Sequence, residues 1–161
     1  MQIRLVRPAD LPACAALLRR AAEEAILHES SAEDAAAFLA EHDEAGLRRN
    51  LDAGFVYHVA LARGDVAGFI GLRGHSHVFH LFVDRSRRRQ GVARRLWEAA
   101  RAAALAADGG HAGVFTVNAS NAAVPFYAAL GFERTAPTQH ARVPYNPMRR
   151  GSAGVPLVGA P

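Results

Sequence analysis

Lysine is missing from this chain of 161 residues, and all 19 of its Lys or Arg positions are arginines. A reaction through a lysine Schiff base is therefore excluded. The single cysteine, Cys14, has no disulfide partner within the chain and suits a reducing compartment. No apolar run reaches membrane-spanning length, and the opening MQIRLVRPAD lacks the apolar core of a signal peptide. We therefore expect a cytoplasmic protein that does not enter a membrane.

Hydrophobic residues make up 50% of the chain, which favours a packed core over disorder. The length fits one domain, which we expect to span residues 1–150. Residues 151–161 contain Gly, Pro and small residues without a period, and we expect them to form a flexible tail. The net charge of +4 does not by itself indicate a nucleic-acid partner, because codon composition also produces a chain rich in Arg and Ala.

The hydrophobic pattern predicts strands and helices around one sheet, a mixed α/β (α+β) fold. Strands are expected over residues 2–7, 76–83, 111–119 and 142–150. Residues 55–74 are expected to form a hairpin with Gly64-Asp65 as its turn. Helices are expected after a cap at Asp10, within residues 33–51, over 91–107, and over 120–130 up to Gly131.

The stretch HLFVDRSRRRQGVARRLWEAAR, residues 80–101, places an arginine cluster, Arg85–Arg95, between a predicted strand and a predicted helix. The first N–H groups of a helix have no partner within it and its dipole is positive there, so an anion binds well at this end. Gly91 lets the anion approach. A solvated loop, a nucleic-acid patch and a phosphate cradle all remain possible from the charges; the Walker pattern is absent.

The spacing Arg88-x-x-Gly91-x-Ala93 after the strand HLFV resembles the GNAT superfamily of acetyl-CoA-dependent N-acetyltransferases. The segment SNAAVPFYAALGF at 120–132, the opening IRLVRPADLPACAALL and the closing VPYNPMRR are also similar to that family. The resemblance covers residues 1 to about 150. It implies a single mixed, mostly antiparallel central sheet flanked by helices, and transfer of an acetyl group from acetyl-CoA to a primary amine.

The resemblance also implies where acetyl-CoA binds. Backbone N–H groups of Arg88, Arg89, Gln90, Gly91, Val92 and Ala93 are expected to hold its pyrophosphate. The main chain of Leu81, Phe82 and Val83 is expected to pair with the pantetheine arm like an added strand. Many family members have an Asn where this chain has Ser120, so Asn118 and Asn121 become the candidates for that cofactor contact.

For the chemistry, Tyr127 matches the tyrosine that in this family is proposed to protonate the departing thiolate. The family does not fix the base. Strand alternation predicts that His77, Phe79, Leu81 and Val83 share one face and that His80 is a packing residue on the other. His77, whose position carries a Glu or His base in several members, is our predicted base, acting directly on the amine or through a water. No metal site is expected.

Three function classes remain at this point. The first is an N-acetyltransferase in whose ternary complex the amine attacks acetyl-CoA directly. The others are a catalytically silent CoA-binding module and a nucleic-acid binder that uses the Arg85–Arg95 cluster. We expect the first, with a small-molecule amine as acceptor, no specific nucleic acid, and a monomer or homodimer. Acidic residues are frequent before residue 45, and they either attract a cationic amine or form an ordinary solvated face; these are Glu29, Glu33, Asp34, Glu41 and Asp43.

Overall fold

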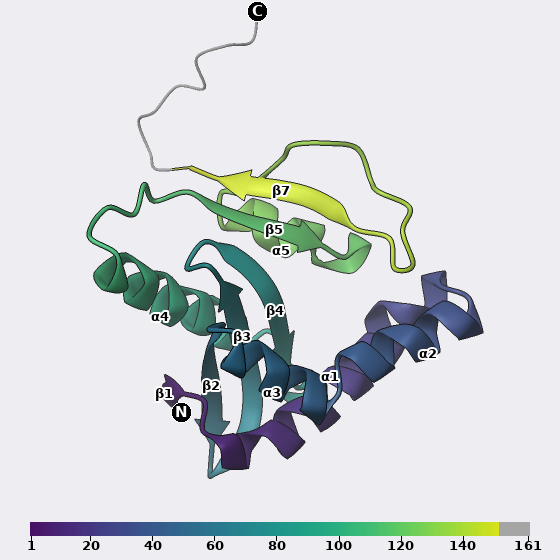
Figure 1. Cartoon of the computed structure of the whole chain (residues 1–161), viewed down its shortest axis with the longest axis horizontal. Coiled ribbons are helices and arrows are strands. Elements are labelled where there is room, and N and C mark those ends of the chain that lie inside the picture. The colour runs from purple at the N-terminus through teal and green to yellow at the C-terminus, as the bar shows by residue number, and fades with distance from the viewer. Residues whose placement is uncertain (152–161) are drawn as a thin grey trace, which may run out of the picture.

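Seven strands form a single sheet in this computed structural model, which describes residues 1–151 (Figure 1). The sheet order is β1-β2-β3-β4-β5-β7-β6, and every strand pair is antiparallel except β4 with β5. The strands are β1 (Gln2–Leu5), β2 (Val56–Ala62), β3 (Asp65–Arg73), β4 (His77–Val83), β5 (Phe115–Ala119), β6 (Glu133–Arg134) and β7 (Asn146–Arg150). The predicted fold class, a mixed and mostly antiparallel sheet flanked by helices, is confirmed.

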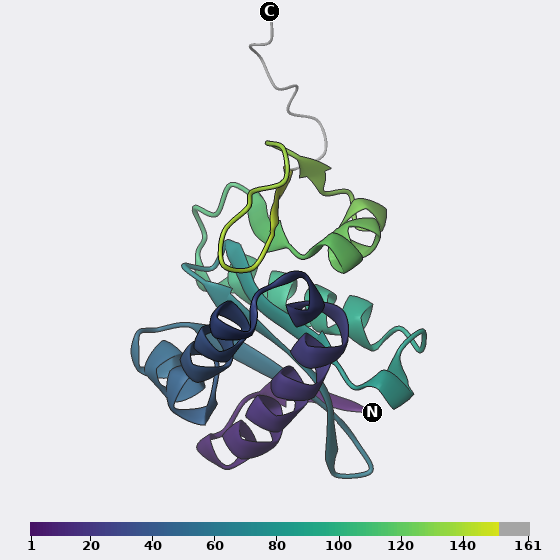
Figure 2. The ribbon, with the colours of Figure 1, turned by 90° about the vertical axis from the view of Figure 1, so that its right-hand side faces the viewer.

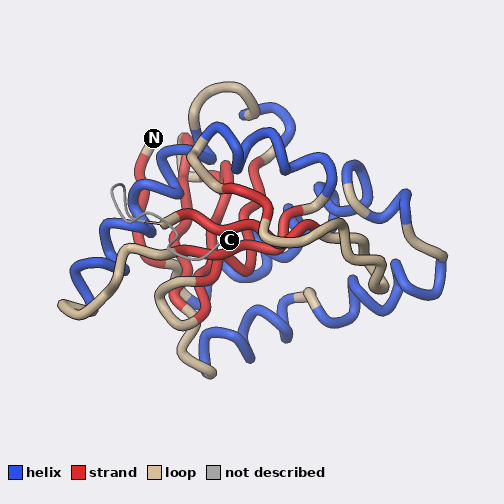
Figure 3. The backbone as a smooth tube through the Cα atoms, turned by 90° about the horizontal axis from the view of Figure 1, so that it is seen from above, coloured by secondary structure: helices blue, strands red, loops and turns tan. Residues whose placement is uncertain are grey.

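Helices cover both faces of the sheet (Figures 2 and 3). They are α1 (Leu11–Ala25), α2 (Ala32–Glu41), α3 (Glu44–Asp52), α4 (Val92–Ala107) and α5 (Val124–Ala129). One core lies between the sheet and α1 and α3, and we call this side the α1 face. The other core lies between the sheet and α4, whose Leu96 and Trp97 are buried there, and we call it the α4 face. None of the helices within residues 1–151 has the length and apolar character that a membrane crossing requires.

Several predicted boundaries are corrected by the structure. The region 33–51 contains two helices, because Asp43 accepts a hydrogen bond from the Gly46 N–H and so caps a separate α3. The hairpin turn is Arg63-Gly64, one residue before the prediction, since both of these residues have a positive φ. Asp10 precedes α1, but its carboxylate binds Arg4 and does not cap the helix. The predicted tail, residues 151–161, lies outside the described residues except for its first residue.

Strands β4 and β5 separate after two paired positions. His77 pairs with Thr116 and Val78 with Val117, and no further pair joins the two strands within residues 1–151. Figure 1 shows β5 and β7 crossing above β2, β3 and β4 in a different direction. The main chain of residues 80–83 therefore has a partner on the β3 side and an open edge on the other side. An open strand edge is a template for pairing with another extended chain.

A β-bulge in β4 overturns the predicted alternation of its side chains. His80 pairs with Gly71 and Val78 with Leu72, so Phe79 is an extra residue without a cross-strand partner. Val78 and Leu81 consequently both pack in the core of the α4 face, although their numbers differ by an odd step. The opposite, α1 face of β4 carries His77, Phe79, His80 and Phe82. The prediction that His77 shares a face with Leu81 and Val83, opposite His80, was therefore wrong.

Candidate functional site

The loop between β4 and α4 presents a row of unused backbone donors. The N–H groups of residues 89–94 have no hydrogen-bond acceptor within the described part of the chain. Gly91 stands at the N-cap of α4 with φ 75°, and a Cβ atom built there meets no atom within 4 Å. Free N–H groups, the positive end of a 16-residue helix and open space together form a site for an anionic group.

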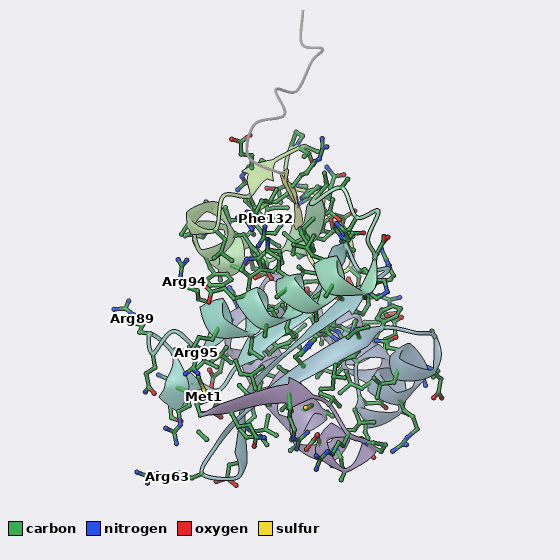
Figure 4. All side chains as sticks on the ribbon, turned by 90° about the vertical axis from the view of Figure 1, so that its left-hand side faces the viewer. Met1, Arg63, Arg89, Arg94, Arg95 and Phe132 are labelled. Carbon is green, nitrogen blue, oxygen red and sulfur yellow. The ribbon has the colours of Figure 1, made fainter. Side chains whose placement is uncertain are left out.

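Main-chain atoms, more than side chains, form this cradle. The Val92 side chain is buried in the core, and the Gln90 amide donates to the Ser86 carbonyl oxygen at 3.1 Å. Arg88 and Arg85 both form an ion pair with the Glu24 carboxylate, with N···O distances of 3.4 Å and 4.0 Å. Figure 4 shows the labelled Arg89 and Arg94 extending away from the body of the protein. Most arginines of the cluster thus provide positive charge at the rim and do not form a closed pocket.

Two cavities lie side by side along the open edge of β4. The first, the Arg88 cavity, has a volume of about 300 Å³, and its lining includes Leu81, Val83, Arg88 and Ala93. The second, the His42 cavity, has a volume of about 430 Å³, and its lining includes His42, Arg73, His77, Phe79 and Asn118. Residues that line both cavities mark their junction, and these are Ile26, Leu81, Phe82, Ser120, Ala123 and Tyr127.

Tyr127 is held at this junction by the α4-face core. Its ring packs against Phe126 and Phe132, and the residue is only 4% exposed. Its hydroxyl makes no hydrogen bond to any of residues 1–151, although Tyr127 lines both cavities. Burial raises the pKa of Tyr127 well above that of a free phenol. The phenol therefore keeps its proton at neutral pH and presents it to the junction.

His77 lies in the His42 cavity where β4 and β5 are still paired. Its Nδ1 is 2.8 Å from Thr116 Oγ1. Burial lowers the pKa of His77, and the nearby positive charge of Arg73 lowers it further. The imidazole is thus mostly neutral at pH 7. If Nδ1–H donates to Thr116, the Nε2 lone pair remains available to accept a proton.

The two asparagines predicted to contact the cofactor differ in position. Asn118 lines the His42 cavity at the end of β5. Asn121 lines neither cavity, since its Nδ2 donates to Glu29 at 2.7 Å and its Oδ1 accepts from Asn146 at 2.8 Å. The geometry therefore brings Asn118 and Ser120 to the groove and leaves Asn121 in a structural network.

Most of the acidic residues before residue 45 already have partners. Arg142 binds both Asp34 and Glu41, at 3.6 Å and 2.8 Å. Asp43 caps α3 and Glu29 accepts from Asn121. Of these acidic residues only Glu41 lines the His42 cavity. The hypothesis that this stretch attracts a cationic amine therefore gains no support. Within residues 1–151, no three His, Cys, Asp or Glu side chains gather where a metal ion could be held.

Residues 26–151 match the family model of the acetyltransferase (GNAT) domain. The chain belongs to the GNAT acetyltransferase family. It is accordingly an enzyme of the N-acetyltransferase class, and the family transfers acyl groups from acyl-CoA. No curated protein matches the sequence.

Solved GNAT structures share the whole fold. A GCN5-related N-acetyltransferase from Rhodopseudomonas palustris is 26% identical, with a TM-score of 0.79 over 93% of this chain and 94% of that one. The PaiA N-acetyltransferase from Thermoplasma acidophilum, in complex with coenzyme A, is 14% identical, with a TM-score of 0.76 over 94% and 99%. A ribosomal-protein-alanine N-acetyltransferase from Brucella melitensis is 24% identical, with a TM-score of 0.66 over 94% and 99%.

The sequence pattern gave no indication of two further residues in this GNAT groove. His42 is the C-cap of α2, 38 positions before the strand residue that it contacts, and Arg73 ends β3. Neither belongs to a motif with a recognisable spacing. Both reach the His42 cavity only through the packing of α2 and the β3–β4 hairpin against the groove.

Proposed function

We propose that this protein transfers the acetyl group of acetyl-CoA to the primary amine of a small molecule by direct attack in a ternary complex. One observation carries the proposal: Tyr127, a protonated phenol, stands where the Arg88 cavity meets the His42 cavity. A thioester that reaches this junction from the Arg88 side meets an amine that enters from the His42 side.

The free N–H groups of residues 89–94 fit the pyrophosphate of acetyl-CoA. Glycine at position 91 leaves open the space that phosphate oxygens would occupy. The open edge of β4 at Leu81–Val83 suits the amide groups of the pantetheine arm, which would extend the sheet as an extra strand. The related fold from Thermoplasma acidophilum in complex with coenzyme A supports this arrangement.

The reaction forms a C–N bond and breaks a C–S bond. The amine nitrogen attacks the thioester carbonyl carbon and loses one proton to a base, while the departing sulfur takes the proton of Tyr127. The products are an N-acetylated amine and the free thiol of CoA. Tyr127 then regains a proton from solvent through the groove.

His77 is the base in this proposal. Its lowered pKa keeps it neutral, its hydrogen bond with Thr116 orients the ring, and it lines the cavity that the amine would enter. The corrected alternation of β4 places His77 on the same face as Phe79, which also lines that cavity.

Release of CoA thiol from acetyl-CoA, measured with a panel of primary amines, tests the activity. The cradle is tested by the Gly91→Glu variant, which puts a carboxylate into the space of the phosphates and should weaken acetyl-CoA binding more than about tenfold in calorimetry. Gly54→Glu is the matched control, because Gly54 also has a positive φ and open surroundings.

Equal acetyl-CoA affinity of Gly91→Glu and wild type would refute the cradle. Tight acetyl-CoA binding without amine-dependent thiol release would instead identify a silent CoA-binding module.

A further inference from the structure

A chain of hydrogen bonds leads from the α1-face core into the His42 cavity, and the proposed reaction does not use it. Asn50 Nδ2 donates to Tyr57 Oη at 3.0 Å. Tyr57 Oη lies 2.9 Å from His80 Nδ1, and His80 Nε2 lies 2.8 Å from His42 Nδ1. Of these four residues, His42 and His80 line the cavity, while Tyr57 and His80 are 3% and 4% exposed.

The two inner members of this chain are fixed in position. Glycine at position 71 makes room for the Tyr57 ring, since a Cβ atom there would collide with it. His80 stands on the α1 face of β4 between Tyr57, Phe69 and Phe82. The Phe38 ring stacks on His42 with centroids 4.2 Å apart. The orientation of the His42 ring is therefore fixed by the stacked Phe38 ring and by the hydrogen bond with His80.

The row of hydrogen bonds from Asn50 to His42 also determines which atom of each pair donates the proton. Tyr57 accepts from Asn50, and the remaining partner for its own proton is His80 Nδ1. Burial raises the pKa of Tyr57 to about 12, so the phenol keeps that proton. His80 then carries its proton on Nε2 and donates it to His42 Nδ1. Neutral His42 in turn carries its proton on Nε2, which has no hydrogen-bond partner among residues 1–151.

Arg73 is a second free donor at the same cavity. Its guanidinium lies over the Phe79 ring at 5.7 Å, and the His42 ring lies 5.8 Å from the same ring. No carboxylate of residues 1–151 lies within 4.0 Å of Arg73. Glu41, the acidic residue of the cavity lining, is already bound to Arg142. The His42 cavity therefore has an uncompensated positive charge and a directed N–H donor, both near the Phe79 ring.

We propose that the acceptor amine also carries a carboxylate, as an amino acid does, and that Arg73 and His42 Nε2–H bind this carboxylate. This inference rests on the proposed function and assigns its substrate class. A guanidinium and an N–H donor bind a carboxylate through charge-assisted hydrogen bonds. Phe38, Phe79 and Tyr145 provide apolar contact for the rest of the molecule. A polycationic amine would meet the like charge of Arg73.

The test compares three sets of acceptors: amino acids, the matching amino-acid amides, and the matching decarboxylated amines, each with acetyl-CoA. For wild type, kcat/KM of the best amino acid should exceed that of its amide and its decarboxylated amine by at least about tenfold. Arg73→Gln should reduce this ratio to nearly one. Arg63→Gln is the control, because Figure 4 shows Arg63 at the tip of the β2–β3 hairpin, and it should leave the ratio intact.

The role of the hydrogen-bond chain is tested by two further variants. His42→Phe keeps the stacked ring without the donor and should also reduce the ratio. Tyr57→Phe removes the group that fixes the His80 tautomer and should reduce the ratio less than His42→Phe does, with kcat for the amides little changed.

Three results would overturn the inference. The first is amides or decarboxylated amines that match or exceed the amino acids in wild type. The second is a ratio that survives Arg73→Gln. The third is a His42→Phe variant that loses turnover with all three sets of acceptors and also loses the acidic limb of its pH–rate profile. In that case His42 would be the base and not a carboxylate-binding residue.

A binding measurement separates failure of this inference from failure of the proposed function. With CoA present, an amino acid should raise the Tm of wild type more than its amide does, and Arg73→Gln should abolish the difference. If no amine releases thiol yet this difference holds, the carboxylate site stands and acyl transfer fails. Equal Tm shifts for acid and amide would refute the carboxylate site whatever the activity.

Discussion

The two ends of the groove beside β4 expose different parts of the chain. Next to the Arg88 cavity, the backbone N–H groups of the consecutive residues 89–94 are free, and most side chains of these residues are exposed to solvent or buried in the core. At the His42 cavity, the polar groups are side chains instead: His42 follows α2, Arg73 ends β3 and His77 begins β4. A main-chain site recognises a group that all acyl-CoA molecules share, whereas a side-chain site distinguishes one acceptor from another.

The junction between these ends is where the largest effect is expected. Tyr127→Phe removes the proposed proton donor and keeps the aromatic packing against Phe126 and Phe132. Because general acid catalysis contributes roughly 10²–10⁴ in rate, kcat should fall about a hundredfold while the Kd of acetyl-CoA stays nearly constant. Steady-state kinetics and calorimetry on one protein preparation measure both. A parallel loss of acetyl-CoA affinity would mean that Tyr127 belongs to the cofactor end and not to the junction.

A smaller effect, on the pH profile, is expected at the acceptor end. The pKa of His77 lies below its ordinary 6.5, so the neutral base prevails above that pH and is lost as pH falls through the lowered pKa. His77→Ala should lower kcat at least about tenfold and flatten this acidic limb. Arg73→Gln removes a charge that lowers the pKa, so it should move the limb to higher pH.

His28→Ala is the control for that profile, since His28 is exposed and lines neither cavity. An unchanged limb in His77→Ala would transfer the base role to another group of the acceptor end.

The smallest effect is expected from side chains at the cofactor end. Replacing Arg87 and Arg89 together by Gln should weaken acetyl-CoA only a few-fold, because exposed charge pairs contribute about 0–1 kcal/mol each. Calorimetry on this double variant, beside a control double variant at Arg48 and Arg63, measures the effect.

A nucleic-acid binder would respond differently to the same change. Loss of two phosphate-binding arginines would lower the slope of log K against log salt by nearly two. Fluorescence anisotropy with labelled DNA and RNA across a salt series separates the two cases. Micromolar nucleic-acid affinity at physiological salt that disappears in the Arg87 and Arg89 variant would contradict the cofactor assignment of this loop.

The difference between the two ends also explains what the sequence could predict. The cofactor end follows from one contiguous stretch, since a strand, a glycine at the N-cap and a helix dictate the free N–H groups through backbone geometry alone. Gly91 and the resemblance of residues 80–93 were therefore sufficient to predict the loop in which the structure has free N–H groups. Tyr127 was reachable through the segment PFYAALGF, whose spacing from Gly91 is typical of the family.

The acceptor end depends on packing between distant segments, which a single sequence does not specify. His42 contacts His80 because α2 ends at residue 41 and Asp43 caps a new helix that begins at Glu44. The prediction of one helical region within residues 33–51 did not include this break. The alternation of β4 failed because a bulge leaves no sign in hydrophobic residues such as Val78 and Phe79. Asn121 was chosen by its proximity to the family position, but Asn146 and Glu29 hold its side chain elsewhere.

The bulge at Phe79 makes the groove tolerant of the loss of one residue from β4. In a regular strand, gain or loss of one residue turns every following side chain to the opposite face. In β4, His77 and Val78 occupy the faces that they would have if Phe79 were absent, because Phe79 is the unpaired residue of the bulge. Position 79 is thus a point where the strand can lose a residue, and with it one aromatic wall of the His42 cavity, while Val78 and Leu81 stay in the core.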